Sequence, residues 1–252
     1  MKKSLTIKNA SHIAIMKEAG ASLASIFKRL EPMIKKGTTP KDVDFFIEKC
    51  MMDVGLKPSC KNYQGTYPFV SCISVNDVAV HGIPGDVPFK EGDIVKVDSV
   101  GSLQGLHVDM ARTFIVGEGS DVAKKLKDCA EESLICALAV IRPGAYISDI
   151  AKAVSGCIEK HGFYPIKEFM GHGIGWEMHE EPGIPNYLHP YFKDVMIREG
   201  MALAVEPMIF EYEDSAYIDV DGWTARSKNG ALSSHYEDTI VVTRDGCEVV
   251  TV

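Results

Sequence analysis

The sequence predicts an α+β fold made of two similar halves, each with two helices and a sheet. The phrases EGDIVKVD (91–98) and EGMALAVE (199–206) both begin with Glu-Gly, continue as an apolar run and end on a carboxylate. A second set recurs at nearly the same offset, since Gly37, Val43, Cys50 and Gly55 match Gly144, Ile150, Cys157 and Gly162. Such a repeat indicates a duplicated unit. Because no Ser- or Gly-rich linker separates the copies, we expect a single domain over 1–252, with halves at about 10–117 and 118–252.

Two amphipathic helices are predicted in each half. Apolar residues recur at helical spacing through 10–34, and Thr39 followed by Pro40 opens a second helix. The second half repeats this order, with one helix over about 122–138 and another after the Arg-Pro-Gly turn at 142–144. Short β-rich runs predict strands at 69–75, 94–100, 113–116, 202–205 and 239–243.

Composition excludes several classes of protein. The longest uninterrupted apolar run, 134–141, is far shorter than the roughly 20 residues of a membrane span, so we expect no membrane protein. Lys8, Lys17 and Glu18 interrupt any apolar core of a secretory signal. The seven cysteines contain no CxxC pair, which suits reduced thiols in a cytoplasm. A cytoplasmic location is therefore expected.

Charge is distributed unevenly along the chain. Residues 1–41, expected to begin with a basic helix, hold nine Lys or Arg and two acids, whereas the whole chain has a net charge of −8. An acidic body argues against DNA binding. The basic segment is either the solvated face of a helix or a weak contact with an RNA-rich particle such as the ribosome. Because no long apolar interface stripe is visible, we expect a monomer.

Five side chains suit a metal centre. Asp98 and Glu206 end the two matching strands, and Asp109, His172 and Glu237 lie in HVDMARTF, GHGIG and HYEDT. Burying an acid unpaired is costly, and clustered acids repel one another, so a shared divalent charge compensates both. Four carboxylates and one imidazole suit two divalent cations bridged by shared carboxylates. The alternative for any single acid is a cap, a turn or a surface charge.

Six separated motifs carry a family resemblance. HGIP (81–84), VD (97–98), D-x-ART (109–113), GHGIG-x-x-x-HE-x-P (171–182), VEP (205–207) and YEDTI (236–240) resemble type I methionine aminopeptidases of the pita-bread superfamily. The resemblance covers nearly the whole chain. It implies a pita-bread fold with a dinuclear site and removal of the initiator methionine from nascent polypeptides, with small second residues preferred.

By motif position, the resemblance assigns roles to particular residues. Asp98, Asp109, His172, Glu206 and Glu237 would bind two divalent ions (Co, Mn, Fe, Ni or Zn), and His81 and His179 would be catalytic. A water that loses its proton on the metals would attack the first peptide bond, with Glu206 as general base. The substrate pocket implied comprises Cys60, Tyr63, Tyr67, Cys72, His81, Met178, His179, Met208 and Trp223. Asn76, Val78 and Ser233 match a site for a monovalent cation, Na or K.

Some positions depart from the family's pattern, and other functions stay open. Met178 stands where an aromatic residue is usual, His235 stands where Gln is common, and Thr66 resembles a one-residue insertion. A proline-directed peptidase of the same superfamily would keep the metal ligands, although such enzymes usually carry a large N-terminal domain. A pita-bread binding module without catalysis is disfavoured because all five ligand positions hold competent residues.

Overall fold

The computed structural model describes residues 5–252, so the first four residues of the basic segment 1–41 lie outside it. The four predicted helices are present: α1 (Ala10–Leu30), α2 (Pro40–Asp53), α3 (Asp121–Val140) and α4 (Ile147–Lys160). Side-chain oxygens of Asn9, Thr39 and Ser120 accept from backbone N–H groups in the first turns of α1, α2 and α3. These caps satisfy N–H groups that have no partner inside the helix and so fix where each helix begins.

The first helix is shorter than the apolar pattern predicts. It ends at Leu30 and continues only as a 3₁₀ turn over Glu31–Met33, instead of running to residue 34. Pro32 is the physical reason, because it has no N–H to donate and its ring clashes with the carbonyl four residues earlier. The basic residues Lys35 and Lys36 therefore lie in the loop that follows the helix.

A nine-stranded sheet forms the centre of the molecule. Its main path runs β1-β4-β5-β14-β9-β7-β8, with β2 beside β4 and β15 beside β14. The strands are β1 (Lys57–Pro58), β2 (Cys72–Val75), β4 (Ile94–Leu103), β5 (Leu106–Ile115), β7 (Met170–Gly173), β8 (Glu180–Pro185), β9 (Ala202–Val205), β14 (Glu237–Val242) and β15 (Cys247–Val249).

Two three-stranded sheets accompany the large one. The first has the order β13-β10-β6, and the second has the order β11-β12-β3. A short 3₁₀ turn over Tyr63–Gly65 precedes β2. The strands of the small sheets are β3 (Val78–Val80), β6 (Tyr164–Pro165), β10 (Met208–Phe210), β11 (Ala216–Ile218), β12 (Ala225–Ser227) and β13 (Ser233–His235).

Two of the differences between the observed and the predicted strands have a clear local cause. Gln104 and Gly105 both have positive φ (51° and 83°), so a two-residue turn joins β4 and β5 into a hairpin, and β5 begins at Leu106 instead of residue 113. The strand predicted from residue 69 begins only at Cys72. Asp44 Oδ1 accepts the backbone N–H groups of Val70 and Ser71, which removes them from the sheet.

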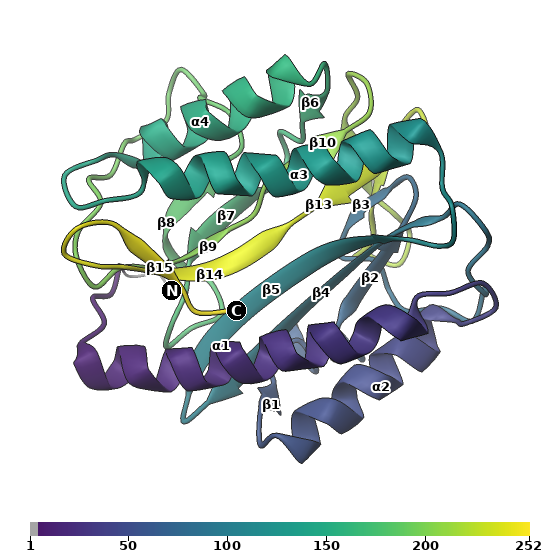
Figure 1. Ribbon diagram of the computed structural model, residues 1–252, viewed down its shortest axis with the longest axis horizontal. Coiled ribbons are helices and arrows are strands. Elements are labelled where there is room, and N and C mark those ends of the chain that lie inside the picture. Colours follow the sequence, from purple (N-terminus) through teal and green to yellow (C-terminus); the bar gives the residue numbers. More distant parts are fainter. Residues whose placement is uncertain (1–4) are drawn as a thin grey trace.

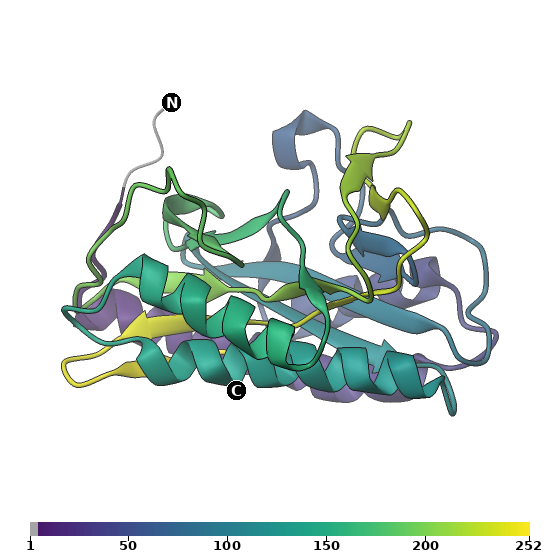
Figure 2. The ribbon, with the colours of Figure 1, turned by 90° about the horizontal axis from the view of Figure 1, so that it is seen from above.

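The helices cover one face of the large sheet, and the small sheets and long loops lie on the other (Figures 1 and 2). One apolar core joins α1 and α2 to β4 and β5, and a second joins α3 and α4 to β9 and β14. The helix lengths repeat between the halves, at 21 and 14 residues and then 20 and 14. This repetition supports the duplication, and the mixture of helices and antiparallel strands confirms the α+β class.

The length and apolar content of the helices also bear on membrane insertion. Among residues 5–252, no helix is both long and apolar enough to cross a bilayer.

A close backbone contact under α1 gives a test of the packing. A Cβ atom on Gly20 would lie 2.1 Å from the carbonyl oxygen of Val250, where the C-terminal residues pass beneath the helix. We expect Gly20→Ala to lower the free energy of unfolding by about 1–3 kcal/mol, because backbone cannot yield as a flexible side chain does. Gly156→Ala is the control, since no other group among residues 5–252 lies within 4 Å of its added Cβ. Urea unfolding should show that Gly156→Ala raises the free energy of unfolding slightly, by up to about 1 kcal/mol. Equal changes for the two variants would contradict the close packing of Gly20 against Val250.

Candidate active site

The register of the large sheet brings the sequence-predicted acids onto one face. Asp98 on β4 and Glu237 on β14 are both paired with Ala111 on β5, so these three positions form one row across three strands. Glu206 directly follows β9, whose Val205 pairs with Asp238 next to Glu237. Because side chains in one row point to the same face, three carboxylates converge there, and the methyl group of Ala111 leaves room between them.

The neighbouring row adds Asp109 and His172 on the same face. Asp109 is two residues before Ala111 on β5, and His172 on β7 pairs with Ala204, two residues before Glu206. Direct pairing of β5 with β14 stops beside Asp109. There the Thr239 hydroxyl accepts from the Asp109 N–H (2.8 Å) and donates to its carbonyl (2.9 Å). This exchange fixes the backbone of Asp109 where the two strands separate.

Two imidazoles flank the carboxylates. His172 Nε2 lies 3.6 Å from Glu206 Oε1 and 3.9 Å from Asp109 Oδ2. Nδ1 of the same ring lies 2.9 Å from the Gly173 carbonyl oxygen, so it donates there and leaves the Nε2 lone pair directed at the acids. His235 Nε2 lies 3.4 Å from Glu206 Oε2 and 3.6 Å from Glu237 Oε2.

Burial and crowding perturb the acids strongly. Burial, followed by the charge of Asp109, raises the pKa of Asp98, Glu206 and Glu237 well above their ordinary values. Burial also raises the pKa of Asp109 to about 6. Burial lowers the pKa of His235 to about 3, so this ring is neutral at pH 7. The protein thus brings together acids whose ionised forms it does not itself stabilise.

Buried polar atoms that have no hydrogen-bond partner in the described part of the chain test whether the site fits divalent ions. Asp109 Oδ1, Glu237 Oε1 and His235 Nε2 are such atoms, and all three belong to this cluster. Ligand atoms of Asp109, His172 and Glu237 lie within 4.8 Å of one another, as do those of Asp98, His235 and Glu237. Orphaned oxygen and imidazole donors in two overlapping groups are what two divalent cations require, so the donor set fits them.

The GHGIG motif serves close packing. A Cβ on Gly171 would lie 2.5 Å from the Ala204 carbonyl oxygen, and one on Gly173 would lie 2.2 Å from that of Glu181. Both glycines therefore let β7 fit between its neighbours and hold His172 over the acids.

Two cavities meet at the acids. One, of about 240 Å³, is lined by sulfur and aromatic groups, among them Cys60, Tyr67 and Trp223. The other, of about 540 Å³, is more polar and contains Glu206, His172 and His235. His81, Asp98 and His179 line both. A molecule that extends from one cavity into the other must pass these three side chains.

The two predicted catalytic histidines have distinct surroundings. His179 Nδ1 lies 2.9 Å from the Tyr63 hydroxyl, and its ring meets that of His172 at a centroid distance of 4.3 Å. His81 has a positive φ of 58° and packs edge-on against Phe169. Burial lowers the pKa of His81 to about 4, so it is neutral at pH 7.

Most predicted pocket residues line the smaller cavity, but one does not. Cys60, Tyr63, Tyr67, Cys72, His81, Met178, His179 and Trp223 line it, whereas Met208 lines the larger one. Met208 lies on β10, where it is paired with His235 and packs with Phe210, so it belongs to the polar side of the acids. Sequence reasoning missed Gln64 and Val100 as lining residues. Val100 could have been found, because it is two residues beyond Asp98 and shares its face.

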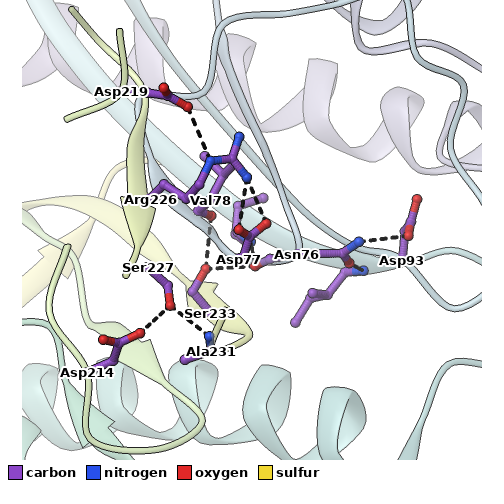
Figure 3. Close-up of polar contacts among 12 residues, drawn as sticks. Asn76, Asp77, Val78, Asp93, Asp214, Asp219, Arg226, Ser227, Ala231 and Ser233 are labelled. Atoms are coloured by element: carbon purple, nitrogen blue, oxygen red, sulfur yellow. Dashed lines mark hydrogen bonds and ion pairs between the residues drawn. The ribbon is translucent and has the colours of Figure 1, made fainter. Parts of the chain in front are cut away.

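The three residues predicted for a monovalent-cation site lie together. The Ser233 hydroxyl lies 2.9 Å from the Val78 carbonyl oxygen and 3.1 Å from that of Asn76 (Figure 3). The Lys96 ammonium, which the sequence reasoning did not single out, donates to the same Asn76 carbonyl at 2.8 Å. Asp77 pairs with Arg226 beside them, as Figure 3 also shows.

Comparisons with known proteins decide the family. The model of metallopeptidase family M24 matches residues 14–244. The chain belongs to metallopeptidase family M24. Methionine aminopeptidase 1 of Bacillus subtilis is 38% identical over 246 residues, which are 97% of this M24 chain and 98% of its relative. The crystal structure of methionine aminopeptidase from Thermotoga maritima has 39% identity and a TM-score of 0.94, covering 98% of this chain and 99% of that chain.

A more distant solved structure shares the fold. Prolidase from Pyrococcus furiosus has a TM-score of 0.79 at 22% identity, covering 98% of this chain and 65% of that chain. Its likeness bears on architecture alone. Together, the comparisons confirm both the pita-bread fold and the resemblance to methionine aminopeptidases that the sequence motifs carry.

Proposed function

We propose that this M24 metallopeptidase removes N-terminal methionine from peptides and nascent proteins by hydrolysing the first peptide bond. The observation that carries the proposal is the junction of the two cavities at the acids. A small cavity on one side suits a single side chain, and an open polar cavity on the other suits the rest of a peptide. The peptide bond after the first residue would then lie beside His81, Asp98 and His179.

Five residues would hold the metals in this proposal. Asp98, Asp109, His172, Glu206 and Glu237 are the donors, and the orphaned buried oxygens of Asp109 and Glu237 support that assignment. Two divalent cations bound there would supply positive charge that lowers the pKa of a water and polarises the scissile carbonyl. Carboxylate and imidazole donors admit Co, Mn, Fe, Ni or Zn, so the donor set does not choose among them.

Side chains would carry out the proton transfer, stabilise the developing charge and position the peptide. Glu206 takes a proton from the attacking water and delivers it to the leaving amine nitrogen. His179 donates from Nε2 to the carbonyl oxygen as negative charge develops on it, with Tyr63 holding Nδ1. The neutral His81 ring positions the peptide at the mouth of the small cavity.

The small cavity favours an unbranched thioether. Its walls combine the thiols of Cys60 and Cys72, the thioether of Met178 and aromatic rings, and Tyr67 meets Trp223 edge-on at 5.2 Å. Sulfur and aromatic groups make favourable contacts with a methionine side chain. Tyr67 is fixed by donation to the Ser71 carbonyl at 2.9 Å, so the wall is rigid. We further propose that a small second residue is preferred, as the family resemblance implies.

The hydrogen bond between Tyr63 and His179 gives a prediction. We expect Tyr63→Phe to lower kcat/KM by about tenfold, because an unmade hydrogen bond of about 1.4 kcal/mol releases Nδ1 and with it the tautomer of His179. Steady-state kinetics on a methionyl peptide measure the change. Because Phe keeps the ring that lines the cavity, a large rise in KM at unchanged kcat would contradict the role assigned to the hydroxyl.

The decisive experiment compares two peptides. Enzyme freed of metal by chelation and reloaded with Co(II) or Mn(II) is incubated with Met-Gly-Met-Met and with a matched Xaa-Pro peptide, and release of the first residue is measured. We expect metal-dependent release of methionine from the first peptide alone. Cleavage only before proline would instead support the proline-directed peptidase, and no cleavage with any metal would support a binding module.

Partners and location are proposed with the same function. Nascent polypeptide N-termini would be the substrates, the location would be cytoplasmic, and the protein would be a monomer without DNA or membrane partners. Lys28, Arg29, Lys35 and Lys36, at and after the end of α1, would provide a weak ribosome contact. Reversing these four charges should reduce co-sedimentation with ribosomes; unchanged co-sedimentation would remove the contact from the proposal.

A further inference from the structure

His235 and His172 lie on opposite sides of Glu206. His172 Nε2 lies 3.6 Å from Glu206 Oε1, and His235 Nε2 lies 3.4 Å from Glu206 Oε2. His235 Nε2 also lies 3.6 Å from Glu237 Oε2. Each candidate donor group thus contains one imidazole: His172 with Asp109 and Glu237, and His235 with Asp98 and Glu237.

The distances from His235 Nε2 to the two carboxylates approach those between atoms that share a cation. They exceed the roughly 2.7–3.2 Å of an N–H···O hydrogen bond. Two donors bound to one ion by bonds of about 2.1 Å are themselves about 3.0–3.4 Å apart in octahedral or tetrahedral geometry. The spacing of His235 Nε2 from Glu206 and Glu237 is close to this second range.

The fold holds His235 in this place. Its side chain is buried, and within residues 5–252 its Nε2 has no hydrogen-bond partner. The Thr113 hydroxyl donates to the His235 carbonyl at 2.7 Å and accepts from its N–H at 3.1 Å. A buried ring nitrogen without a partner is costly, so its orientation toward the acids needs a compensating ion.

We propose that His235 is a sixth metal-binding residue, which completes the position formed by Asp98 and Glu237. This inference rests on the dinuclear site proposed above. Both positions then carry one imidazole, whereas an amide at residue 235 would leave the second position with oxygen donors only. The consequence is tighter binding of the second ion and a preference for Co, Ni or Zn over Mn at that position, because imidazole suits these metals better.

Metal titration of the whole protein tests the proposal without an activity assay. Wild type, His235→Gln and the exposed-loop control His189→Gln are freed of metal and titrated with Co(II), recording calorimetry and visible absorption. We expect two equivalents to bind wild type and the control, and the second to bind His235→Gln at least about tenfold more weakly with a changed spectrum. Equal affinity and an unchanged spectrum in His235→Gln would overturn the role of His235.

Two further outcomes separate this inference from the proposed function. Binding of a single equivalent by wild type would overturn the dinuclear site and, with it, the sixth donor. If His235→Gln does not fold, wild type labelled with ¹⁵N-histidine is titrated with Zn(II) and its ring nitrogens are followed by NMR. Coordination shifts on two histidines are expected, and a shift on His172 alone would overturn the proposal.

A separate observation concerns Lys96, two residues before Asp98. Its side chain is fully buried, and within residues 5–252 no carboxylate lies at ion-pair distance from it. Its ammonium donates to the Asn76 carbonyl, which also accepts from the N–H and hydroxyl of Ser233 at 3.2 and 3.1 Å. An ammonium held by a main-chain carbonyl oxygen makes the kind of contact that a bound sodium or potassium ion would make there.

We infer that the Lys96 ammonium takes the place of a monovalent cation at Asn76, Val78 and Ser233. It links β4 to the turn between β2 and β3, whose Asn76 carbonyl also accepts from Ser233 on β13, the strand that ends at His235. A dissociable ion stabilises a protein to an extent that depends on the free concentration of that ion. Because the Lys96 ammonium is covalently attached to the chain, the stability of this junction does not depend on the salt in solution.

Thermal unfolding in different chlorides tests the role of Lys96. We expect the same Tm for wild type in sodium, potassium and tetramethylammonium chloride at equal ionic strength. Lys96→Gln should have a lower Tm that sodium or potassium raises relative to tetramethylammonium. A wild-type Tm that depends on sodium or potassium would overturn the inference, and so would a folded Lys96→Gln protein that is indifferent to all three. If the variant does not fold, the salt dependence of the wild-type Tm alone still tests the inference.

Discussion

Glu206→Gln should lower turnover on Met-Gly-Met-Met by about 10²–10⁴-fold while the folded protein still binds the peptide. Glutamine keeps the size of the side chain and one oxygen donor but cannot accept a proton. The carboxylate it replaces lies between His172 and His235 and lines the larger cavity, where the attacking water must be deprotonated. The loss should therefore fall mainly on kcat and much less on KM.

The same substitution should stabilise the protein when metal is removed. Burial and the charge of Asp109 raise the pKa of Glu206, so its ionised form is unfavourable in the folded chain. Removing that charge relieves repulsion within the cluster. We therefore expect the variant to have a higher Tm than wild type in the presence of a chelator. In saturating metal, we expect the variant to have the lower Tm.

Glu199→Gln is the matched control, because Glu199 begins the same EGMALAVE phrase but is exposed. Metal content should be measured for each protein, so that loss of a bound ion is not mistaken for loss of the base. Turnover of the Glu206 variant within a few-fold of wild type at full metal loading would refute the assignment of Glu206 as general base.

The helices and their starts could be predicted from sequence because the signals are local. Thr39 with Asp42 forms a capping box around the first turn of α2, and all its atoms lie within four residues of one another. The end of α1 was missed by a few residues because the apolar spacing continues past Pro32, which stops the regular hydrogen bonding.

The acids could be named from sequence, but their convergence could not be derived from it. It depends on the row Asp98–Ala111–Glu237, which requires β5 to begin at Leu106 and to pair with both β4 and β14. The family resemblance identified the acidic residues but did not reveal how the three strands are paired. That these residues bind metal stays a prediction, which the titration above tests.

The buried ionic groups show where sequence reasoning ends. Lys96 and Asp98 share one face of β4, and a lysine in a strand is ordinarily exposed. It is buried here because the turn at Asn76 and the strand β13, more than a hundred residues later, cover that face. No local sequence pattern indicates that these distant segments cover Lys96. Likewise, no local pattern indicates that Glu180 is the partner of Lys8.

Lys8 and Glu180 form an ion pair whose disruption should cost more stability than any other single change proposed for this chain. Their charged atoms lie 2.6 Å apart, and both side chains are almost fully buried. Glu180 also accepts from the N–H groups of Trp176 and Glu177 at 2.8 and 3.3 Å, so the pair ties the N-terminal segment to the loop that presents His179.

Replacing one partner leaves the other charge buried and unpaired. We expect Lys8→Met or Glu180→Gln alone to lower the free energy of unfolding by about 3–5 kcal/mol, and the double replacement to lower it by clearly less than the sum. The exposed pair of Lys17 with Glu248 is the control, where the same cycle should give less than about 1 kcal/mol. Equal coupling energies for the two pairs would contradict the role of burial.

The pH dependence of the pair has a definite sign. Burial alone would raise the pKa of Glu180, but the hydrogen bonds from Lys8 and Thr6 outweigh it and hold that pKa below its ordinary value of 4.5. A carboxylate with a lowered pKa contributes stability above its unfolded pKa and loses it as the pH falls through the folded one. The stability difference between wild type and Glu180→Gln, measured by urea unfolding, should therefore be constant from pH 7 to about 5 and shrink below about 4.5.

Because Glu180 fixes the loop before His179, turnover should fall with the same substitution, and unchanged turnover would show that His179 is positioned without Glu180.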